Sequence, residues 1–434
     1  MTVVADKTET LRSNFSPHEK PTWDVYSRCI HCGLCLDQCP TYRALGTEMD
    51  SPRGRIYQIV QVDAGKLALG DSFAMHIDRC LGCLNCQTAC PSGVAYGSLL
   101  ERARLQIQEN YHRPWLQRTV RDHFYNKVLP SFSRLAFHAR LVRFYQQSGL
   151  QALARGTGLL NLLGVKDLDA LSPRMERDFS FKDLGEVYPA EGERRGRVAL
   201  LIGCIASVAF AELNRATIRV LTKNGVEVHI PPHQSCCGGL HLHAGMLDGA
   251  RALARRNIDA MLSPEFDAII TNAAGCGSSM KEYAALLQED ATYDHRAAEF
   301  SAKTKDVNEY LAELGLREPK RKLAARVTYQ DPCHLAHAQG VRAAPRQLLR
   351  HVGANLVESP RPETCCGSAG TYNVVQNEIS MKILDEKMGF IGSVSPEIIA
   401  TANVGCMLQY RAGIERANMK ARVAHVIELL DEVY

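Results

Sequence analysis

Eight of the sixteen cysteines stand in two short runs near the N-terminus. Each run reads C-x2-C-x2-C-x3-C-P, and Cys80 opens the second run 51 residues after Cys29 opens the first. Sets of four closely spaced thiolates bind zinc or the irons of a cubane cluster. Zinc ribbons rarely repeat so tight a spacing with the same proline, so the pattern favours two [4Fe–4S] clusters. The predicted metal ligands are Cys29, Cys32, Cys35, Cys39, Cys80, Cys83, Cys86 and Cys90.

The fourth cysteine of each run is expected to cross to the other cluster, as it does in two-cluster ferredoxins. One cluster would then be bound by Cys29, Cys32, Cys35 and Cys90, and the other by Cys80, Cys83, Cys86 and Cys39. The proline after each fourth cysteine fixes φ and turns the chain away from the cluster. His31, Tyr42 and Tyr96 lie beside the motifs and are expected to pack against a cluster rather than to bind it.

The other eight cysteines form a second, longer repeat. Each copy reads C-x31-C-C-G and is followed by a single cysteine after 38 or 39 residues. A turn with two adjacent thiols suits binding of a cofactor or substrate better than a hydrophobic core. The competing interpretation is four buried, inert cysteines per copy. The predicted cofactor-binding residues are Cys204, Cys236, Cys237, Cys276, Cys333, Cys365, Cys366 and Cys406.

Alternating strands and helices are expected to position this second set. In the first copy, apolar runs at residues 197–203, 226–230 and 267–272 read as strands, with a helix predicted over Ala206–Lys223. The second copy repeats the pattern, with strands expected at residues 325–330 and 397–403. Such alternation predicts an α/β architecture with largely parallel strands. All four cysteines of a copy then fall at strand-to-helix junctions, where ligands of parallel sheets usually bind.

A cysteine-free stretch separates the two sets. Residues 101–158 carry ten Lys/Arg against three Asp/Glu, with aromatic residues interleaved, and their first part shows helical periodicity. This stretch is either a docking face for an acidic membrane surface or a partner subunit, or a solvated basic face over a helical core. The expected domains are residues 1–100 (two-cluster ferredoxin type), 101–195 (helical, basic connection), 196–320 and 321–434 (two cysteine-rich α/β domains).

Composition narrows the class of protein. The net charge of +4 over 434 residues is small, which argues against a dedicated nucleic-acid binder. Neither a secretory signal nor a membrane-spanning run is visible, so we expect a cytoplasmic chain with reduced thiols and without a transmembrane segment. A nicotinamide or flavin fingerprint is also missing from the sequence. Asp331, His334 and His337 surround Cys333 and are read as helix-capping or sulfur-bonding groups rather than catalytic ones.

Nearly the whole chain resembles the iron–sulfur subunits of glycolate oxidase, also called glycolate dehydrogenase. The stretches that carry the resemblance are C-I-H-C-G-L-C-L-D-Q-C-P-T-Y, S-P-R-G-R-I-Y, D-R-C-L-G-C-L-N-C-Q-T-A-C-P-S-G-V-A-Y, C-C-G-S-A-G-T-Y and T-A-N-V-G-C. The resemblance implies that separate FAD-binding subunits oxidise glycolate to glyoxylate. This chain would then pass electrons through its clusters toward a quinone or other acceptor. Peripheral association with the cytoplasmic face of the inner membrane is part of the same expectation.

The longer repeat is similar to the CCG, or cysteine-rich, domain family, whose full pattern ends in C-x-x-C. The first cysteine of that ending is replaced here by Ala273 in one copy and Asn403 in the other. This departure counts against the non-cubane cluster chemistry of heterodisulfide reductase and leaves a further Fe–S cluster open. Competing hypotheses for the chain are a D-lactate or anaerobic glycerol-3-phosphate dehydrogenase subunit, a heterodisulfide-reductase-like catalytic subunit, and a C-terminal scaffold that only grips the flavin subunits.

Overall fold

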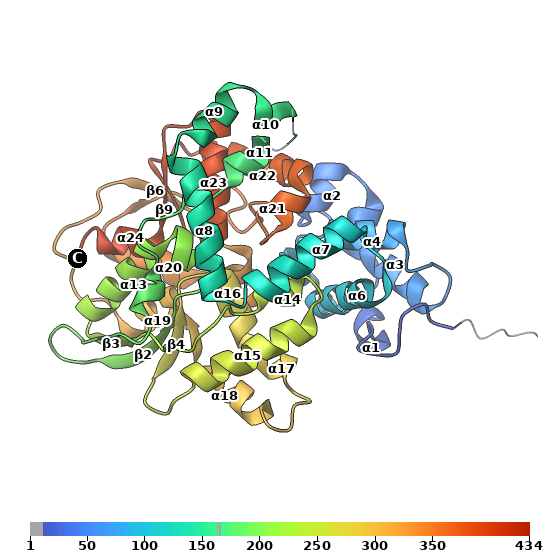
Figure 1. Ribbon diagram of the computed structural model, residues 1–434, viewed down its shortest axis with the longest axis horizontal. Helices are drawn as coiled ribbons and strands as arrows, with labels where there is room; N and C mark the ends of the chain where they lie inside the picture. The colour runs from blue at the N-terminus through green and yellow to red at the C-terminus, as the bar shows by residue number, and fades with distance from the viewer. Residues whose placement is uncertain (1–11, 163, 165) are drawn as a thin grey trace, which may run out of the picture. The chain divides into compact units, whose positions relative to one another are not determined.

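The computed structural model describes residues 12–162, 164 and 166–434 (Figure 1). The described chain divides into two compact units. One comprises the residues up to Arg113 together with His243–Met246, and the other comprises Pro114–Leu242 and Leu247–Tyr434. The sequence-based domain boundaries stay a prediction, and each unit is described by itself below.

The first unit is helical. Its core packs Ile59, Phe73, Ile77 and Leu99, which are at most 1% exposed. Ser51 caps the central helix by accepting a hydrogen bond from Gly54 N, and Pro52 occupies the first helical turn. The elements are α1 (Trp23–Tyr26), α2 (Pro40–Leu45), η1 (Glu48–Asp50), α3 (Pro52–Asp63), α4 (Asp71–Asp78), α5 (Asn85–Thr88) and α6 (Tyr96–Asn110).

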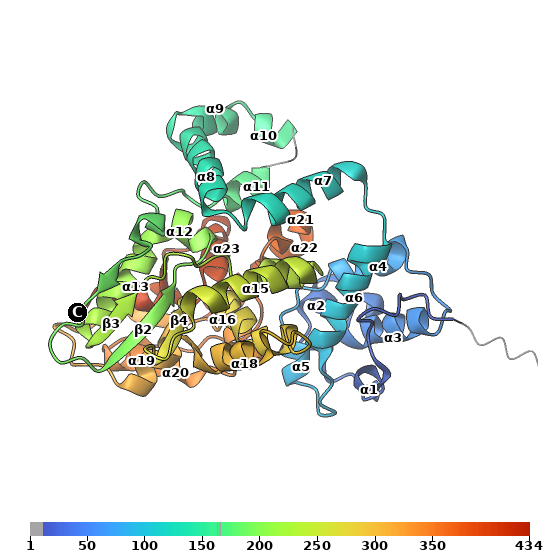
Figure 2. The same cartoon turned by 60° about the horizontal axis from the view of Figure 1, so that its bottom comes forward.

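The second unit begins with a helical segment. Short helices follow one another before the first sheet, and α8 is the longest of them. Figure 2 shows α7, α8, α9 and α10 along one side of this unit. The elements are α7 (Trp115–His123), a π-helical turn η2 (Phe124–Val128), α8 (Phe132–Gln147), α9 (Leu150–Gly156), α10 (Leu159–Leu162), α11 (Lys166–Leu171) and η3 (Ser180–Asp183).

The first sheet has the strand order β1-β3-β2-β4-β5. Only the pairing of β1 with β3 is antiparallel. The central strands are buried on both faces, as is usual for a parallel sheet covered by helices. The strands are β1 (Val187–Tyr188), β2 (Gly196–Leu201), β3 (Val226–His229), β4 (Ala268–Thr271) and β5 (Thr304–Asp306).

The helices around this sheet agree with the predicted alternation, with one difference. The helix predicted over Ala206–Lys223 is broken in two, because Phe210 leaves helical geometry at φ −144° and ψ 37°. The short edge strands β1 and β5 were not predicted. The helices are α12 (Ile205–Ala209), α13 (Ala211–Lys223), α14 (Gly239–His243), α15 (Leu247–Met261), α16 (Ala274–Lys281), α17 (Tyr283–Leu286), α18 (Asp294–Lys303) and α19 (Val307–Leu314).

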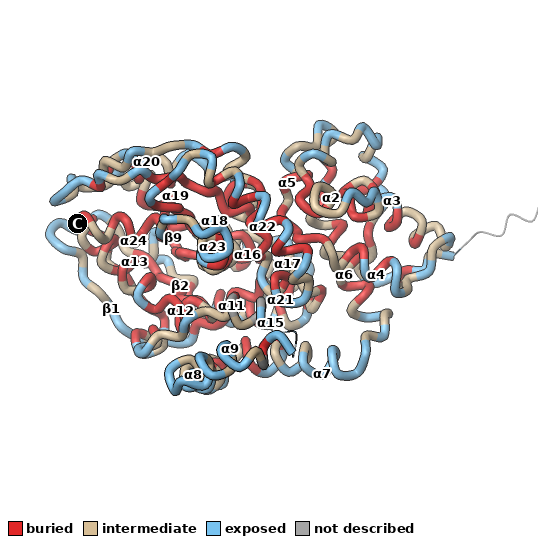
Figure 3. The backbone as a smooth tube through the Cα atoms, turned by 90° about the horizontal axis from the view of Figure 1, so that it is seen from above, coloured by how far each residue is buried: buried red, intermediate tan, exposed pale blue. Residues whose placement is uncertain are grey.

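The second sheet repeats the first in the order β7-β6-β8-β9 and is parallel throughout. Helices of the two copies pack on each other, α13 on α24 and α19 on α20, and Arg219 forms an ion pair with Asp431 at 2.6 Å. Figure 3 colours buried residues red; the central strands β6 and β8 are largely buried, whereas the edge strand β7 is not. The elements are β6 (Arg326–Tyr329), η4 (His334–Ala338), α20 (Ala343–His351), β7 (Asn355–Leu356), α21 (Tyr372–Val375), α22 (Asn377–Gly392), β8 (Ile398–Thr401), α23 (Val404–Ala417), β9 (Arg422–His425) and α24 (Val426–Asp431).

Candidate metal centres

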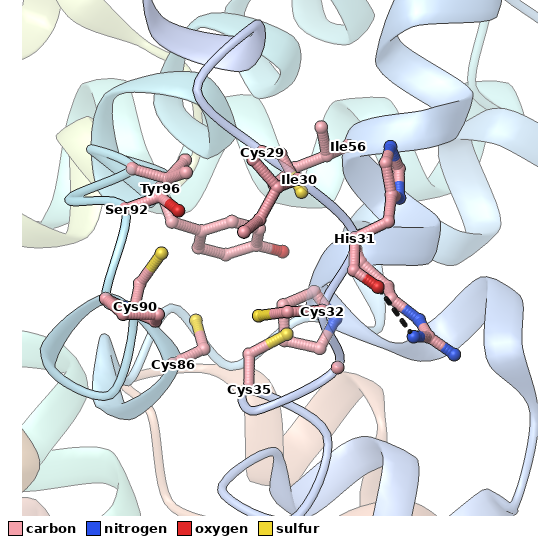
Figure 4. Close-up of a pocket in the computed structure, with 15 residues that line it drawn as sticks. Cys29, Ile30, His31, Cys32, Cys35, Ile56, Cys86, Cys90, Ser92 and Tyr96 are labelled. Atoms are coloured by element: carbon pink, nitrogen blue, oxygen red, sulfur yellow. Dashed lines mark hydrogen bonds between the residues drawn. The ribbon is translucent and has the colours of Figure 1, made fainter.

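Two cysteine-lined cavities lie in the first unit. The loop between α1 and α2 supplies three thiols to the first cavity, and the loop that precedes α6 supplies a fourth (Figure 4). These four are Cys29, Cys32, Cys35 and Cys90, and Cys86 also lines the cavity. Ile56 and Tyr96 close it on the protein side. Cys32 is exposed, so this cavity opens toward solvent.

The second cavity is lined by the remaining thiols of the two runs. Cys80, Cys83 and Cys86 come from the second run, and Cys39 comes from the N-terminal end of α2. All four of these thiols are buried. Three cysteines of one run and the fourth of the other thus line each cavity, with Cys86 shared by both. The crossed assignment of ligands to two clusters stays a prediction.

The two cavities adjoin each other. Cys86, Pro52 and Tyr96 line both of them. Among the described residues, no three Cys, His, Asp or Glu side chains converge as they would on a single metal ion. A cubane instead presents a separate iron to each thiolate, so thiols spaced around a cavity suit it. The donor set and its arrangement thus fit a four-iron cluster in each cavity.

The two loops share an unusual local conformation. His31 and Gly33 in the first run have φ of 55° and 86°, and Gly82 and Leu84 in the second have φ of 66° and 61°. His31 and Gly82 each stand two residues after the first cysteine of their run, and Gly33 and Leu84 stand four residues after it. Left-handed backbone is uncommon outside glycine and is retained where the surroundings demand it. The repeat in sequence is thus also a repeat in backbone geometry, which turns each loop around its cavity.

A buried charge network borders the second cavity. Arg55 of α3 is 1% exposed and donates hydrogen bonds to His76 O (2.7 Å), Thr41 Oγ1 (3.1 Å) and Asp50 Oδ1 (3.4 Å). Burial opposes its charge, but Cys80 and other neighbours raise the pKa of Arg55 overall. A guanidinium at the wall of the cavity stabilises negative charge inside it.

Arg55 was not predicted as a site residue, although it lies in the S-P-R-G-R-I-Y stretch. The helical register of α3 is the signal that could have found it. Arg55 falls among buried neighbours such as Ile56 and Ile59, where an arginine needs a specific partner. Tyr96, expected as a packing neighbour, does line both cavities and also places its hydroxyl 3.5 Å from Cys80 Sγ.

The eight remaining cysteines form two matched rows in the second unit. In the first row, Cys236 lies within hydrogen-bonding reach of Cys204 and Cys237, and Cys237 in turn reaches Cys276. The second row has the same order, Cys333, Cys365, Cys366 and Cys406. Cys333 Sγ and Cys365 Sγ are 4.0 Å apart.

The secondary structure explains why the rows form. Cys204 and Cys333 stand at the start of the turn that follows the central strand, and Cys276 and Cys406 lie in the first turn of α16 and α23. Gly238 and Gly367 directly follow the paired cysteines of the two rows. Their φ of 82° and 93° allows a sharp turn after each pair. Hydrogen bonds from Cys333 and Cys366 lower the pKa of Cys365, which marks it as a candidate thiolate.

The polar residues around Cys333 have structural partners. Arg346 binds Asp331 through both Nη atoms, at 2.8 and 2.6 Å. His334 Nδ1 lies 3.4 Å from Cys333 Sγ, and His337 Nε2 lies 3.2 Å from the carbonyl of Glu363. These contacts are those of sulfur-bonding and loop-fixing groups.

Lys387 is a further residue near the second row that was not predicted. It is a fully buried lysine of α22. Its place among the buried, mostly apolar positions of that helix is the signal in the sequence that could have found it.

Sequence comparisons agree with this arrangement. Residues 25–94 match the family described as 4Fe-4S dicluster domain, residues 116–172 match the linker region of the glycolate oxidase iron-sulfur subunit, and residues 198–281 and 327–411 both match the cysteine-rich domain CCG. The glycolate oxidase iron-sulfur subunit of Escherichia coli (strain K12) is 33% identical over 437 residues, which is 98% of each chain.

A second relative covers a similar span. It is described as a probable glycolate oxidase iron-sulfur subunit of Bacillus subtilis (strain 168) and is 39% identical over 412 residues, 93% of each chain. The chain belongs to the glycolate oxidase iron–sulfur subunit family. It combines the two-cluster domain, the linker and the tandem CCG domains in one polypeptide.

Part of the chain is also similar to a second group. Lactate utilization protein A of Geobacillus kaustophilus (strain HTA426) is 30% identical over 237 residues, 54% of this chain and 98% of that protein. The shorter overlap separates this group from the glycolate oxidase iron–sulfur subunit family, whose relatives align along almost the whole chain.

The linker of this family member exposes apolar side chains. Nothing in α7 is buried, and Trp115 is 76% exposed. In α8, the exposed side chains of Phe137, Leu141 and Phe144 recur every three or four residues and so share one face. The same helix also exposes Arg134 and Arg140 over its buried Leu135, Ala136 and Ala139, so the docking face and the solvated basic face both stay predictions. Across the part of the chain that the structure describes, no helix has the length and apolar character needed to cross a bilayer.

Proposed function

We propose that this chain is the iron–sulfur electron-transfer subunit of a complex that oxidises glycolate. The observation that carries the proposal is the pair of adjoining cavities, each lined by three cysteines of one run and the fourth of the other. The eight thiols are proposed as the ligands of two clusters, with Cys29, Cys32, Cys35 and Cys90 around one and Cys80, Cys83, Cys86 and Cys39 around the other. When bound there, [4Fe–4S] clusters supply one-electron transfer.

The partners follow from the chemistry of the reaction. Oxidation of a hydroxy acid removes a hydride, which an organic acceptor such as a flavin receives. The glycolate-oxidising step is therefore assigned to separate FAD-binding subunits, and a quinone-type molecule is proposed as the final acceptor. The names of the Escherichia coli and Bacillus subtilis relatives support glycolate as the substrate of the complex. The similarity to lactate utilization protein A favours D-lactate as the second candidate.

The two cavities differ in their exposure to solvent, which suggests different roles for the residues around them. Cys32 and the neighbouring Ile30 (69% exposed) and Leu34 (60% exposed) present the first cavity to solvent, so we assign to this loop the contact with a redox partner. In the second cavity, whose thiols are buried, Arg55 and Tyr96 line the wall, and the Tyr96 hydroxyl lies 3.5 Å from Cys80 Sγ. Fixed hydrogen-bond donors and a nearby cation stabilise the reduced, more negative form of a bound cluster.

The two rows of thiols in the CCG domains are proposed as additional cofactor-binding residues. Each row brings four buried or half-buried thiols within reach of one another, and Cys237 and Cys365 have pKa values held low by hydrogen bonds from neighbouring thiols. A further Fe–S cluster is the cofactor that such a thiolate-rich site would hold.

The linker supports a peripheral association with membranes. Exposed Trp115, Leu116 and Val120 in α7 lie close to the basic residues Arg118 and Arg121 in sequence. A basic segment with exposed aromatic and aliphatic side chains binds anionic lipid surfaces. We therefore propose that the chain works at the cytoplasmic face of the inner membrane. Co-sedimentation with anionic vesicles, and its loss in Trp115→Ala/Leu116→Ala, would test this; equal binding to neutral vesicles would contradict it.

One experiment tests the main proposal. Anaerobically purified protein is analysed for iron and acid-labile sulfide, and the dithionite-reduced sample is examined by EPR. We expect about eight irons or more per chain and two magnetically coupled [4Fe–4S] signals. Addition of the flavin subunits and glycolate to the oxidised protein should then reduce the clusters and produce the same EPR signals. Clusters that stay oxidised with glycolate but are reduced with D-lactate would transfer the assignment to the second candidate.

A further inference from the structure

The two rows of thiols sit in matched domains but have different surroundings. Gly238 packs against Ala250 of α15, and Gly367 packs against Ser380 of α22, so these two helices occupy equivalent places. Seven residues further along each helix stand Asn257 and Lys387. Both side chains are buried, and they are the equivalent position of the two copies.

Both side chains bind backbone atoms at or shortly before the paired cysteines. Asn257 accepts a hydrogen bond from Ser235 N at 2.8 Å and donates one to Cys236 O at 3.0 Å. Lys387 donates from Nζ to the carbonyl oxygens of Arg361 (2.9 Å) and Pro362 (2.8 Å). The mechanical role is shared, but one side chain is neutral and the other is a cation.

The cation of Lys387 is expensive to bury. Its Nζ donates to neutral carbonyls, and the nearby Asp331 is already bound in a bidentate manner by Arg346. Burial lowers the pKa of Lys387 to about 8, while Cys366 and then Asp331 oppose that shift. A buried charge persists where an opposite charge compensates it. The opposite charges that act on it are, in decreasing order, those of Cys366, Asp331, Glu363 and Cys365. With Asp331 held by Arg346, the second-row thiol of Cys366 is the largest remaining contribution, ahead of Glu363.

Two more positions distinguish the rows. At the second row, His334 Nδ1 lies 3.4 Å from Cys333 Sγ, and Asn403 Nδ2 donates to Cys406 Sγ at 3.4 Å. The equivalent residues at the first row are Ile205 and Ala273, which have no side-chain donor. Thus a cation and two polar side chains surround the second row at the very positions where the first has an amide and two apolar groups.

We propose that the two CCG domains are not equivalent, and that the second row, Cys333, Cys365, Cys366 and Cys406, binds an anionic iron–sulfur cluster whose charge is compensated by the positioning residue Lys387. The cofactor-binding role proposed above for both rows is thereby narrowed to the second; the first row, without that cation, keeps its thiols but holds no cluster of its own. Each thiol that binds iron gives up its proton to solvent, and the thiolate charge then faces the ammonium group. This inference rests on the proposed function for the identity of the metal.

The first test compares two double variants of the full chain, Cys365→Ser/Cys366→Ser and Cys236→Ser/Cys237→Ser. We expect about twelve irons in the parent chain, loss of about a third of the iron and sulfide in the second-row variant, and no loss in the first-row variant. Equal losses in both variants, or loss in the first-row variant alone, would overturn the proposal.

The second test addresses Lys387 itself. Lys387→Asn installs the first-row residue, and Lys387→Met keeps the length of the side chain without its charge. We expect either the loss of the second-row cluster or, where iron is retained, a lower midpoint potential of its EPR signal. Unchanged iron content together with an unchanged potential would exclude Lys387 as the counter-charge. If both Lys387 variants fail to fold, the iron content of the two Cys→Ser double variants still decides whether the second row alone binds a cluster.

The outcome for the proposed function is separate. About eight irons in the parent chain with two coupled ferredoxin-type signals would refute the second-row cluster and leave the electron-transfer function standing. Absence of those two signals would instead refute the proposed function.

Discussion

The hydroxyl of Tyr96 lies 3.5 Å from the sulfur of Cys80 at the wall between the two ferredoxin cavities. Burial in the first place, and then Cys80, raise the pKa of Tyr96 well above its ordinary value, so the phenol keeps its proton and can donate it to a thiolate. Tyr96 therefore lines both cavities and directly contacts Cys80, a proposed ligand in the second cavity.

Tyr96→Phe removes this donor while keeping the ring. We expect full iron content and a lower midpoint potential for the second-cavity cluster, because the lost hydrogen bond stabilises the reduced form. A hydrogen bond worth about 1 kcal/mol corresponds to a shift on the order of tens of millivolts for a one-electron couple. An EPR-monitored redox titration measures it, with Tyr111→Phe, whose hydroxyl binds Asp71, as the control.

The crossed grouping of thiols predicts which single variants share a phenotype. Cys29→Ser and Cys90→Ser should each remove the first-cavity cluster and leave the same residual EPR signal, although the two residues belong to different runs. Cys39→Ser should resemble Cys80→Ser. In each case about four irons are lost, and electron flow from the flavin subunit to quinone falls. A Cys90→Ser spectrum that matches Cys80→Ser would disprove the crossing.

The turns at the paired cysteines should differ in their tolerance of a methyl group. Both Gly238 and Gly367 have positive φ, but a Cβ at Gly367 would stand 2.7 Å from Ser380 O, against 3.4 Å from the nearest Ala250 atom at Gly238. We expect Gly367→Ala to lower the free energy of unfolding by about 2–4 kcal/mol and Gly238→Ala by about 1–2 kcal/mol. Equilibrium denaturation compares the two variants directly; the reverse order would contradict the contact geometry.

A buried histidine predicts loss of stability in acid. His425 caps α24 by accepting a hydrogen bond from Ile427 N, and burial lowers its pKa from 6.5 to about 4. Because the folded pKa lies below the unfolded one, the unfolded chain binds the proton first. The stabilisation is therefore complete above pH 6.5 and is lost as pH falls toward about 4.

Denaturant unfolding at about pH 7 and pH 5 measures this effect, which we expect to reach about 2 kcal/mol between the two. His425→Asn retains an N-cap acceptor but does not titrate, so its stability should vary less over the same interval. An equally steep pH dependence in the variant would assign the acid sensitivity to other groups.

The local order of the residues determines which cofactor each site can bind. The spacing of Cys29 to Cys39 and its recurrence at Cys80 to Cys90 predict two cubane ligand sets, since the distance between ligands along the chain limits which metal they can bind. The C-x31-C-C-G repeat likewise predicts duplicated α/β domains, because strand and helix periodicity are local properties. Both predictions depend on short-range pattern alone.

The surroundings of those ligands, in contrast, depend on how distant segments pack. Arg55 lines the cavity of Cys39 and Cys80 because residues of α3 line both cavities. Lys387 binds the loop before Cys365 because α22 packs on the turn that holds the paired cysteines. Neither residue is near its cysteines in sequence. Side-chain charge acts through space, so the difference between the two CCG rows emerges only when the folded positions of Asn257 and Lys387 are compared.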